Sequence, residues 1–337
     1  MFSYNYSPTQ KDFWQGRIDS ETNYDAFRWH QWIEVKNLTD DLKPFDIKLG
    51  FGIIGFCCDE GVKRNKGRQG AKKGPFAIRN ELRNLPCRFK QDVKIYDFGD
   101  IHCNDSNLEK AQDDLAYCVD RIISLNLIPL VLGGGHEVAF GNYKGIYKNL
   151  KTQNENPKIG IVNFDAHFDL RPYFEKGNSG TMFRQIADMC IENNTKYSYF
   201  CMGIQKHRNT LDLFKTADKL NAKYVLAKDI QNKNTWPIIE SLDDFIKSND
   251  HIYLTICTDV FSSAYAPGVS ATQPLGINPE KALKFIKYII RSDKLISFDI
   301  AEVSPRFDQD NTTANLASAL IFSIIDTVCQ IKKLNVE

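Results

Sequence analysis

The chain has 337 residues, and 42% of them are hydrophobic, which is enough for a large buried core. Its 43 Lys and Arg residues are balanced by 42 Asp and Glu residues, so the formal net charge is +1. This balance argues against a protein that uses a global positive field to bind nucleic acid or an anionic membrane.

The chain begins with residues 1–45, which carry Trp14, Trp29 and Trp32 and lack the basic-then-apolar pattern of a signal peptide. We expect these residues to form an N-terminal extension that wraps the outside of the domain. Farther along, no apolar run approaches the roughly 20 residues that span a bilayer. Nine cysteines stand at irregular spacings without a CxxC pair, which indicates free thiols in a reducing compartment. We therefore expect a soluble cytoplasmic protein.

Beyond the extension, short apolar segments alternate with helical patterns. Apolar segments typical of buried parallel strands lie at residues 48–56, 93–100, 127–135, 158–167, 196–204, 222–230, 251–259 and 294–303. Helical patterns lie at residues 75–84, 107–126, 137–150, 207–219, 236–248, 278–291 and 312–333. Because strand and helix alternate throughout and no linker is visible, we expect a single α/β domain over residues 1–337 with a mostly parallel sheet.

Polar residues gather where three of the expected strands end, which is where ligands bind in such sheets. They are His136 after three glycines, Asp165, His167 and Asp169 in the motif DAHFD, and Cys257 and Asp259 in CTD. Each motif alone has an ordinary explanation: a helix start, a hydrogen-bonded loop and a buried core thiol. Together, two imidazoles and several carboxylates suit a divalent first-row metal, with Mn²⁺ favoured over Zn²⁺. Two such ions could hold a bridging water and lower its pKa.

These motifs resemble those of the ureohydrolase family, which includes arginases, agmatinases and formimidoylglutamases. The sequences GGGHE (133–137), WQGRID (14–19), SGTMFRQ (179–185) and FDIAEVSPRFD (298–308) resemble the formimidoylglutamase branch. The resemblance implies an arginase-like three-layer α/β/α sandwich with an eight-stranded, mostly parallel sheet. It also implies a metal-dependent hydrolase that binds two Mn²⁺ ions. Its reaction would convert N-formimidoyl-L-glutamate and water to L-glutamate and formamide, a step of histidine degradation.

The resemblance also implies roles for individual residues. The expected metal ligands are His136, Asp165, His167, Asp169, Cys257 and Asp259. Asp169 would also accept a proton from water, and Glu302 would pair with the cationic amidine. Because an arginine fork holds a carboxylate through two bonds, Arg171 and Arg68 are expected to bind the substrate, with Asn65 and Ser179 beside them.

The chain departs from the family pattern at Cys257, where the family has an aspartate that bridges both metals. A thiol is a soft ligand, whereas Mn²⁺ prefers hard oxygen. Three outcomes stay open: a thiolate ligand with Zn²⁺ or Fe²⁺, a single bound metal, or an empty site in a non-catalytic protein that binds small ligands.

Two further alternatives concern the substrate and the partner. One is an arginase- or agmatinase-type hydrolase of a guanidino compound. The other is a nucleic-acid binder built on the basic stretch 61–79, which the neutral chain and the scarcity of aromatics disfavour. The resemblance also implies a homo-oligomer.

Overall fold

The structure is a computed structural model that describes residues 5–231 and 234–336. Its strands are β1 (Tyr6–Ser7), β2 (Glu34–Val35), β3 (Leu49–Cys57), β4 (Val93–His102), β5 (Ile128–Leu132), β6 (Ile159–Phe164), β7 (Tyr199–Ile204), β8 (Lys223–Leu226), β9 (His251–Cys257) and β10 (Leu295–Ala301). They form one sheet in the order β1-β4-β3-β5-β10-β9-β6-β7-β8, with β2 also paired to β4. All the pairs are parallel except β1 with β4.

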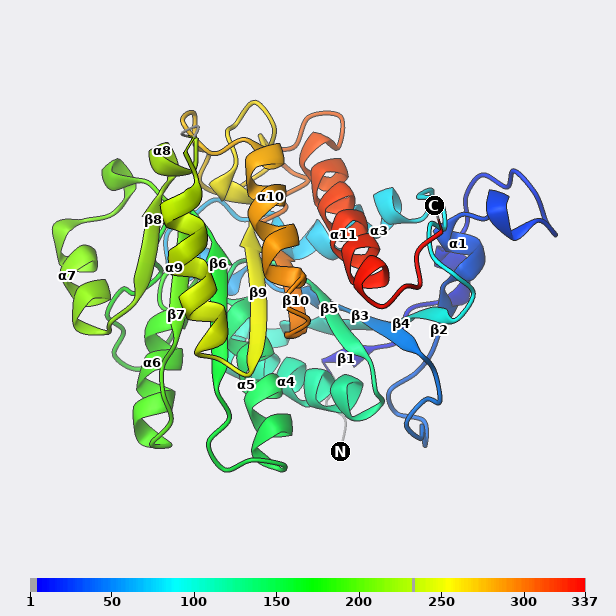
Figure 1. Cartoon of the computed structure of the whole chain (residues 1–337), viewed down its shortest axis with the longest axis horizontal. Coiled ribbons are helices and arrows are strands. Elements are labelled where there is room, and N and C mark those ends of the chain that lie inside the picture. The colour runs from blue at the N-terminus through cyan, green and yellow to red at the C-terminus, as the bar shows by residue number, and fades with distance from the viewer. Residues whose placement is uncertain (1–4, 232–233, 337) are drawn as a thin grey trace.

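Helices cover both faces of this sheet (Figure 1). They are α1 (Trp29–Trp32), α2 (Glu60–Arg64), α3 (Gly74–Leu82), α4 (Leu108–Ser124), α5 (Val138–Lys151), α6 (Met182–Glu192), α7 (Leu211–Lys219), α8 (Ala227–Ile230), α9 (Trp236–Lys247), α10 (Pro279–Ile290) and α11 (Thr312–Ile331). Buried side chains of α3, α8, α9, α10 and α11 form a core on one face, and those of α4, α5, α6 and α7 form a second core on the other. The result is the expected three-layer α/β/α sandwich.

The strand sequences explain why both faces need a helical layer. In β3, Phe51 and Ile53 belong to one core, whereas Ile54 and Phe56 belong to the other, and all four are fully buried. Successive side chains of a strand point to opposite faces, so a strand that is apolar on both faces must be covered twice.

All eight strands expected from the sequence are present, but the expected number for the sheet was too low. The sheet has ten strands because β1 and β2 join it from the N-terminal segment. Each of these two strands has only two residues, so neither leaves a periodic pattern in the sequence. Helix α6 was also not anticipated, although its apolar face is buried.

The N-terminal segment packs along the edge formed by β4, and residues 1–4 of the expected extension lie outside the described residues. The Trp14 indole donates a hydrogen bond of 2.9 Å to Asp97 Oδ2, and Trp29 is fully buried. Arg79 joins Asp97 and Asp100 through ion pairs of 2.9 and 2.6 Å. This buried network links the segment, helix α3 and strand β4.

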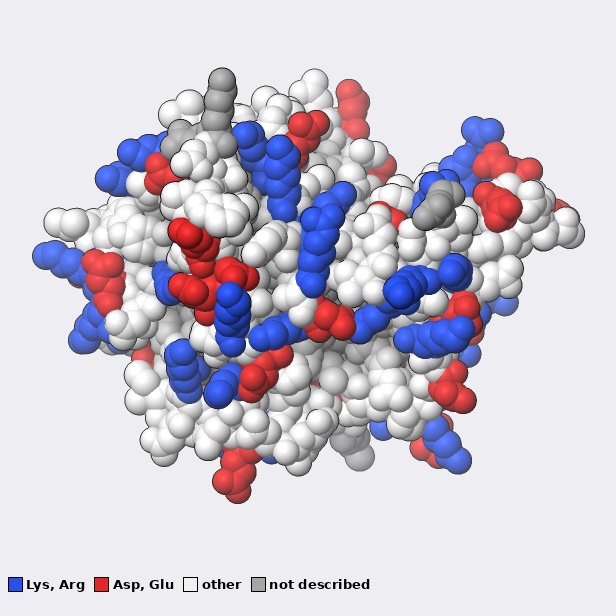
Figure 2. All heavy atoms as spheres, viewed as in Figure 1, with Lys and Arg blue, Asp and Glu red and all other residues white. Residues whose placement is uncertain are grey.

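Helix α11 meets the length and composition of a membrane span, and in the described part of the chain it is the one helix that does. More than half of the relevant window is buried inside the protein, where α11 contacts α3 and α10. Its side chains Ile321, Ile324 and Ile325 belong to the larger core. Core packing therefore accounts for the apolar sequence of α11. Figure 2 shows acidic and basic side chains interspersed on the face of α9, α10 and α11.

Candidate metal and substrate site

A cavity of about 260 Å³ collects the polar residues that follow the strands. It is lined by Asn65, Lys66, Gly67, Arg68, His136, His167, Asp169, Arg171, Ser179, Cys257, Asp259, Ser270, Ala271 and Glu302. Ten of the eleven residues predicted from the sequence to form the site are among them. The eleventh, Asp165, is fully buried, and its Oδ2 lies 2.8 Å from Nδ1 of His136.

The three glycines before His136 let its loop pass between the ends of β3 and β10. The Gly135 amide donates to the Cys58 carbonyl at 2.9 Å, and the Gly133 amide donates to the Ile300 carbonyl at 2.8 Å. A Cβ atom at Gly134 would lie 1.8 Å from the Cys58 carbonyl oxygen, which no side chain tolerates. The glycines therefore allow the close backbone approach that places His136 at the cavity.

Carboxylates from β6 and its following loop surround the two histidines. His136 Nδ1 lies 2.8 Å from Asp165 Oδ2 and 3.2 Å from Asp169 Oδ2. On the other side, Asp165 Oδ1 accepts a hydrogen bond of 2.7 Å from the His167 amide. His167 Nδ1 lies 3.3 Å from Asp165 Oδ1 and 3.3 Å from Asp259 Oδ2. The two oxygens of Asp165 thus face different histidines.

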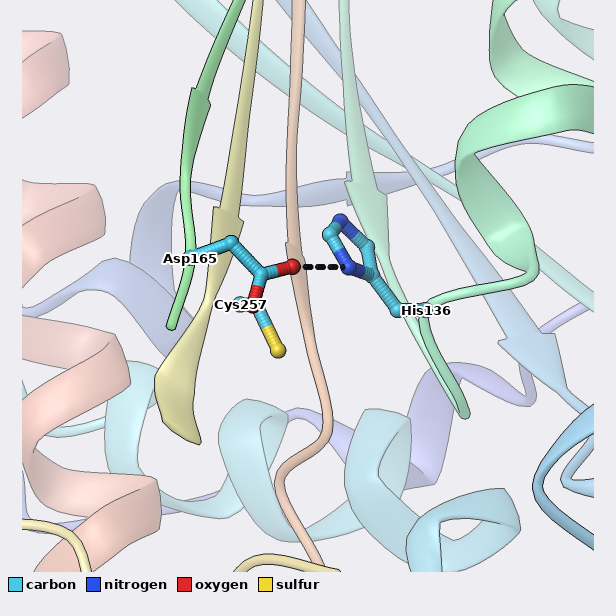
Figure 3. A group of neighbouring side chains, drawn as sticks. All are labelled: His136, Asp165 and Cys257. Atoms are coloured by element: carbon cyan, nitrogen blue, oxygen red, sulfur yellow. Dashed lines mark ion pairs between the residues drawn. The ribbon is translucent and has the colours of Figure 1, made fainter. Parts of the chain in front are cut away.

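Two groups of three possible metal-binding atoms result, and they share Asp165. One contains His136, Asp165 and Cys257, and the other contains Asp165, His167 and Asp259. Within each group the donor atoms lie within 4.8 Å of one another. Figure 3 shows the first group, in which His136 and Asp165 form an ion pair and the Cys257 sulfur lies beside them.

A buried relay behind His136 fixes the orientation of its ring. Thr255 Oγ1 donates to Asp299 Oδ1 at 2.6 Å and lies 3.0 Å from His136 Nε2. Because the threonine proton is directed at Asp299, its oxygen is left to accept from Nε2. This contact keeps a proton on Nε2, so that Nδ1, which faces the carboxylates, is the nitrogen that can give up its proton to a bound ion, as in metal sites where a ligating histidine is held by an outer partner. Thr255 and Asp299 were not predicted from the sequence, where the one sign of each is a polar residue inside an apolar strand.

The carboxylates and histidines of the cluster shift one another's pKa values. Burial by itself lowers the pKa of His136, but the hydrogen bonds and charges of Asp165 and Asp169 outweigh it and raise that pKa well above the ordinary value. Burial, together with the charge of Asp165, raises the pKa of Asp169 to about 6. Burial and the Asp259 charge also raise the pKa of Glu302. The hydrogen bonds and charges of His136 and His167 lower the pKa of Asp165, so the two imidazoles favour a bound proton where a cation would otherwise supply the positive charge.

Two buried oxygens provide a direct test of whether a cation fits. Asp259 Oδ1 and Glu302 Oε2 have no hydrogen-bond partner among the described residues. A buried carboxylate oxygen without a partner is costly, and two of them beside one cavity indicate missing positive charge, which for Asp259, a member of one metal-binding group, is a bound cation. Imidazole nitrogens, carboxylate oxygens and one sulfur are ligands for a divalent first-row metal. The residues therefore fit such an ion.

Two of the cavity carboxylates sit on an unusual backbone. Asp169 has a φ of 49° and Glu302 a φ of 67°, which is the left-handed region that residues other than glycine rarely adopt. The Glu302 amide is held by the Gly134 carbonyl at 2.8 Å, and its Oε1 accepts from the His136 amide at 3.1 Å. Such strain is concentrated at functional sites.

The outer part of the cavity carries cations with different roles. Arg171 is exposed, and no carboxylate of the described chain lies within ion-pair distance of it. Arg68, in contrast, donates to the carbonyls of Ser270 and Val269 at 2.9 and 2.7 Å and stacks on Phe307. These contacts favour a role for Arg68 in holding the loop.

Two polar residues predicted beside these cations form a bridge between loops. The Asn65 amide nitrogen lies 3.2 Å from Ser179 Oγ, which ties the end of α2 to the loop before α6. Lys66 also lines the cavity, with a φ of 61°. Sequence reasoning missed Lys66 because nothing distinguishes it within the basic stretch.

The sequence of this chain matches those of known proteins. A family model described as the arginase family matches residues 49–326. The chain is 62% identical over 333 residues to a formimidoylglutamase of Clostridium tetani, covering 98% of both chains. It is 43% identical over 325 residues to a formimidoylglutamase of Legionella pneumophila (strain Lens), covering 96% of this chain and 98% of the other.

Solved structures share the fold. Formimidoylglutamase from Bacillus subtilis matches with a TM-score of 0.78 at 22% identity and covers 94% of this chain and 96% of its own. Formiminoglutamase from Trypanosoma cruzi, solved with two Mn²⁺ ions, matches with a TM-score of 0.73 at 22% identity and covers 87% of this chain and 98% of its own.

Proposed function

The chain belongs to the arginase family, and we propose that it hydrolyses N-formimidoyl-L-glutamate to L-glutamate and formamide. The observation that carries this proposal is the 62% identity to a formimidoylglutamase over 98% of both chains. The cavity supports it, because the residues that the family resemblance implies converge there.

We propose that the site holds a divalent metal centre, as the T. cruzi neighbour does with Mn²⁺. The residues that would hold it are His136, Asp165, His167, Asp169, Cys257 and Asp259. The chemistry that such an ion supplies is the activation of water toward attack on the amidine carbon.

The chain's own carboxylates take the remaining roles. Asp169 accepts the proton of the attacking water, since its carboxylate lies beside His136 and lines the cavity. Glu302 binds the cationic amidine, since its Oε2 is buried and has no hydrogen-bond partner among the described residues. The backbone contacts of Glu302 hold this carboxylate in place while the amidine carbon is attacked.

The entrance of the cavity suits a substrate with two carboxylates. Arg171 and Lys66 both line it, and their positive charges can each pair with one carboxylate of formimidoyl-glutamate. Arg68 adds a third positive charge nearby. Agmatine carries an amine where this substrate carries carboxylates, so the same cations disfavour it by like-charge repulsion.

Product analysis tests the proposal. Protein loaded with Mn²⁺ is incubated separately with N-formimidoyl-L-glutamate, arginine and agmatine, and formamide and urea are measured. We expect formamide from the first substrate and no urea from the other two. His136→Ala should abolish turnover, whereas His251→Ala, at the opposite end of β9, should retain it. Urea release, or no formamide from metal-loaded protein, would contradict the proposal.

The setting of the enzyme belongs to the same proposal. We infer a role in histidine degradation, a cytoplasmic location and a homo-oligomer without nucleic-acid or membrane partners. All nine cysteines lie in the described part of the chain and are free thiols, which agrees with a reducing compartment. The oligomer stays a prediction.

A further inference from the structure

We propose that the metal centre is asymmetric, with one subsite for a thiophilic ion and one for a hard ion. The subsite of His136, Asp165 and Cys257 selects Zn²⁺, Fe²⁺ or Co²⁺, and the subsite of Asp165, His167 and Asp259 selects Mn²⁺. This inference rests on the proposed function for the presence of a metal centre and adds the identity of the ion in each half.

The position of the Cys257 sulfur is the first support. Cys257 is the last residue of β9, is fully buried, and pairs in register with Ala301 of β10. Its Sγ lies within 4.8 Å of the donor atoms of His136 and Asp165 (Figure 3). The sulfur is therefore close enough to reach an ion bound by the other two donors of the first group.

A second buried cysteine shows what an ordinary core thiol does here. Cys201 is also fully buried beside Asp165, but its Sγ is directed at backbone carbonyls, 3.5 Å from that of His167 and 3.9 Å from that of Asp165. The Sγ atom of Cys257, in contrast, lies within 4.8 Å of the donor atoms of His136 and Asp165. Of these two cysteines, Cys257 is the one that belongs to a group of possible metal donors in the described part of the chain.

Asp165 contributes one carboxylate oxygen to each half of the centre. Its Oδ2 faces His136 at 2.8 Å, and its Oδ1 faces His167 at 3.3 Å. The half that contains His167 is completed by Asp259, whose buried Oδ1 has no hydrogen-bond partner among the described residues. Each half thus has one imidazole and one oxygen of Asp165, and Asp169 Oδ2 also lies beside His136 in the first half, 3.2 Å from Nδ1. The third donor of each group differs, being the Cys257 sulfur in the first and an Asp259 oxygen in the second.

That third donor decides the preference for metal. Sulfur is a soft ligand that favours Zn²⁺, Fe²⁺ and Co²⁺, whereas carboxylate oxygen is a hard ligand that suits Mn²⁺. Ion binding at the first subsite forms one metal–sulfur bond and releases the thiol proton to solvent, with no change of oxidation state. An aspartate at position 257 would supply oxygen and remove the asymmetry.

Cobalt is the probe that reports sulfur ligation without reference to turnover. Metal-free protein is titrated with Co²⁺ while the sulfur-to-cobalt charge-transfer absorption and the bound cobalt are measured. We expect the absorption to saturate at one ion per chain while total cobalt continues to two. Cys257→Asp and Cys257→Ser should both lose the absorption, and the matched control Cys201→Ala should keep it.

A competition experiment tests the selectivity. Because sites of nitrogen and oxygen ligands also bind Zn²⁺ more tightly than Mn²⁺, metal-free protein is incubated with one equivalent of Zn²⁺ per chain and a large excess of Mn²⁺, and the bound metals are measured by elemental analysis. We expect the wild-type protein to retain one zinc and one manganese per chain, and Cys257→Asp to exchange the zinc for manganese much more readily. The Mn²⁺ resonance of the wild-type mixed centre should be that of an isolated ion.

The outcomes separate this inference from the proposed function. Two cobalt ions bound without the charge-transfer absorption, or an absorption that survives in Cys257→Asp, would overturn the asymmetric centre even if formamide is released. The absorption at one equivalent in wild-type protein supports the asymmetric centre even if no formamide is released, in which case only the proposed function fails.

Discussion

Replacing Thr255 with valine tests whether the relay behind His136 prepares the metal site. The hydroxyl of Thr255 lies 3.0 Å from His136 Nε2 and donates to Asp299 at 2.6 Å, and both partners are almost completely buried. Valine keeps the shape of threonine but leaves the Nε2 proton and one Asp299 oxygen without their partner. The imidazole then loses the contact that directs Nδ1 toward Asp165.

The expected magnitude follows from these two losses. A buried polar group left unsatisfied costs about 1–3 kcal/mol, so the two groups together should lower the free energy of unfolding by about 2–6 kcal/mol. Losing an outer partner of a metal-bound histidine weakens metal binding by about 10–100-fold. The variant should therefore be less stable and also bind metal more weakly.

The two effects are measured separately. Urea unfolding of metal-free protein gives stability, and competition with a chelating dye gives the dissociation constant for Mn²⁺. Thr255→Ser restores a hydroxyl and should recover most of the metal affinity. The control is Thr327→Val in α11, which removes a buried hydroxyl that donates to the Ser323 carbonyl, far along the chain from the site. It should lose stability and bind metal normally. If Thr255→Val binds metal as tightly as wild type despite a loss of stability, the relay does not orient His136.

Three further predictions concern substrate, stability and pH. Arg171→Gln should raise KM for formimidoyl-glutamate by about 10–100-fold with little change in kcat, because a hydrogen bond to a charged group is lost; steady-state kinetics showing a kcat loss alone would contradict this. Arg79→Met should lower the free energy of unfolding, measured by urea unfolding, by about 3–5 kcal/mol, because two carboxylates lose their buried partner. The control Arg184→Met, at a more exposed ion pair, should change this free energy by about 0.5 kcal/mol at most. Equal losses in the two variants would refute the reasoning. Metal affinity measured by calorimetry should fall as the pH is lowered through about 6, because Asp165 and Asp169 raise the pKa of His136 well above its ordinary value and burial raises the pKa of Asp169 to about 6, so protons compete with the ion for both groups. An affinity independent of pH in this range would exclude both groups as ligands.

The position of the site could be predicted from the sequence because one rule of parallel-sheet geometry determines it. Parallel strands end at one edge of the sheet, so residues just after β5, β6 and β9 must lie near one another even though His136 and Asp259 are far apart in the chain. The eight long strands were recognisable for a related reason. Their continuous apolar runs are what burial on both faces demands.

The features that escaped prediction depend on tertiary contacts. Strands β1 and β2 are too short to leave a pattern and exist because they pair with β4. The sequence does not show that Thr255 and Asp299 join behind His136, since they come from different strands. It also gives no sign that the guanidinium of Arg68 is engaged by the carbonyls of a loop some 200 residues away.

Strand order has a consequence for how this protein matures. Strand β10 is the last strand in the chain, yet it lies in the middle of the sheet between β5 and β9 (Figure 1). Until it is synthesised, His136 belongs to one group of strands and Asp165, His167 and Asp259 to another, and nothing joins the two groups edge to edge. The metal ligands can therefore come together only after almost the whole chain has been synthesised. A prematurely terminated product that lacks β10 would have the ligands but no assembled centre.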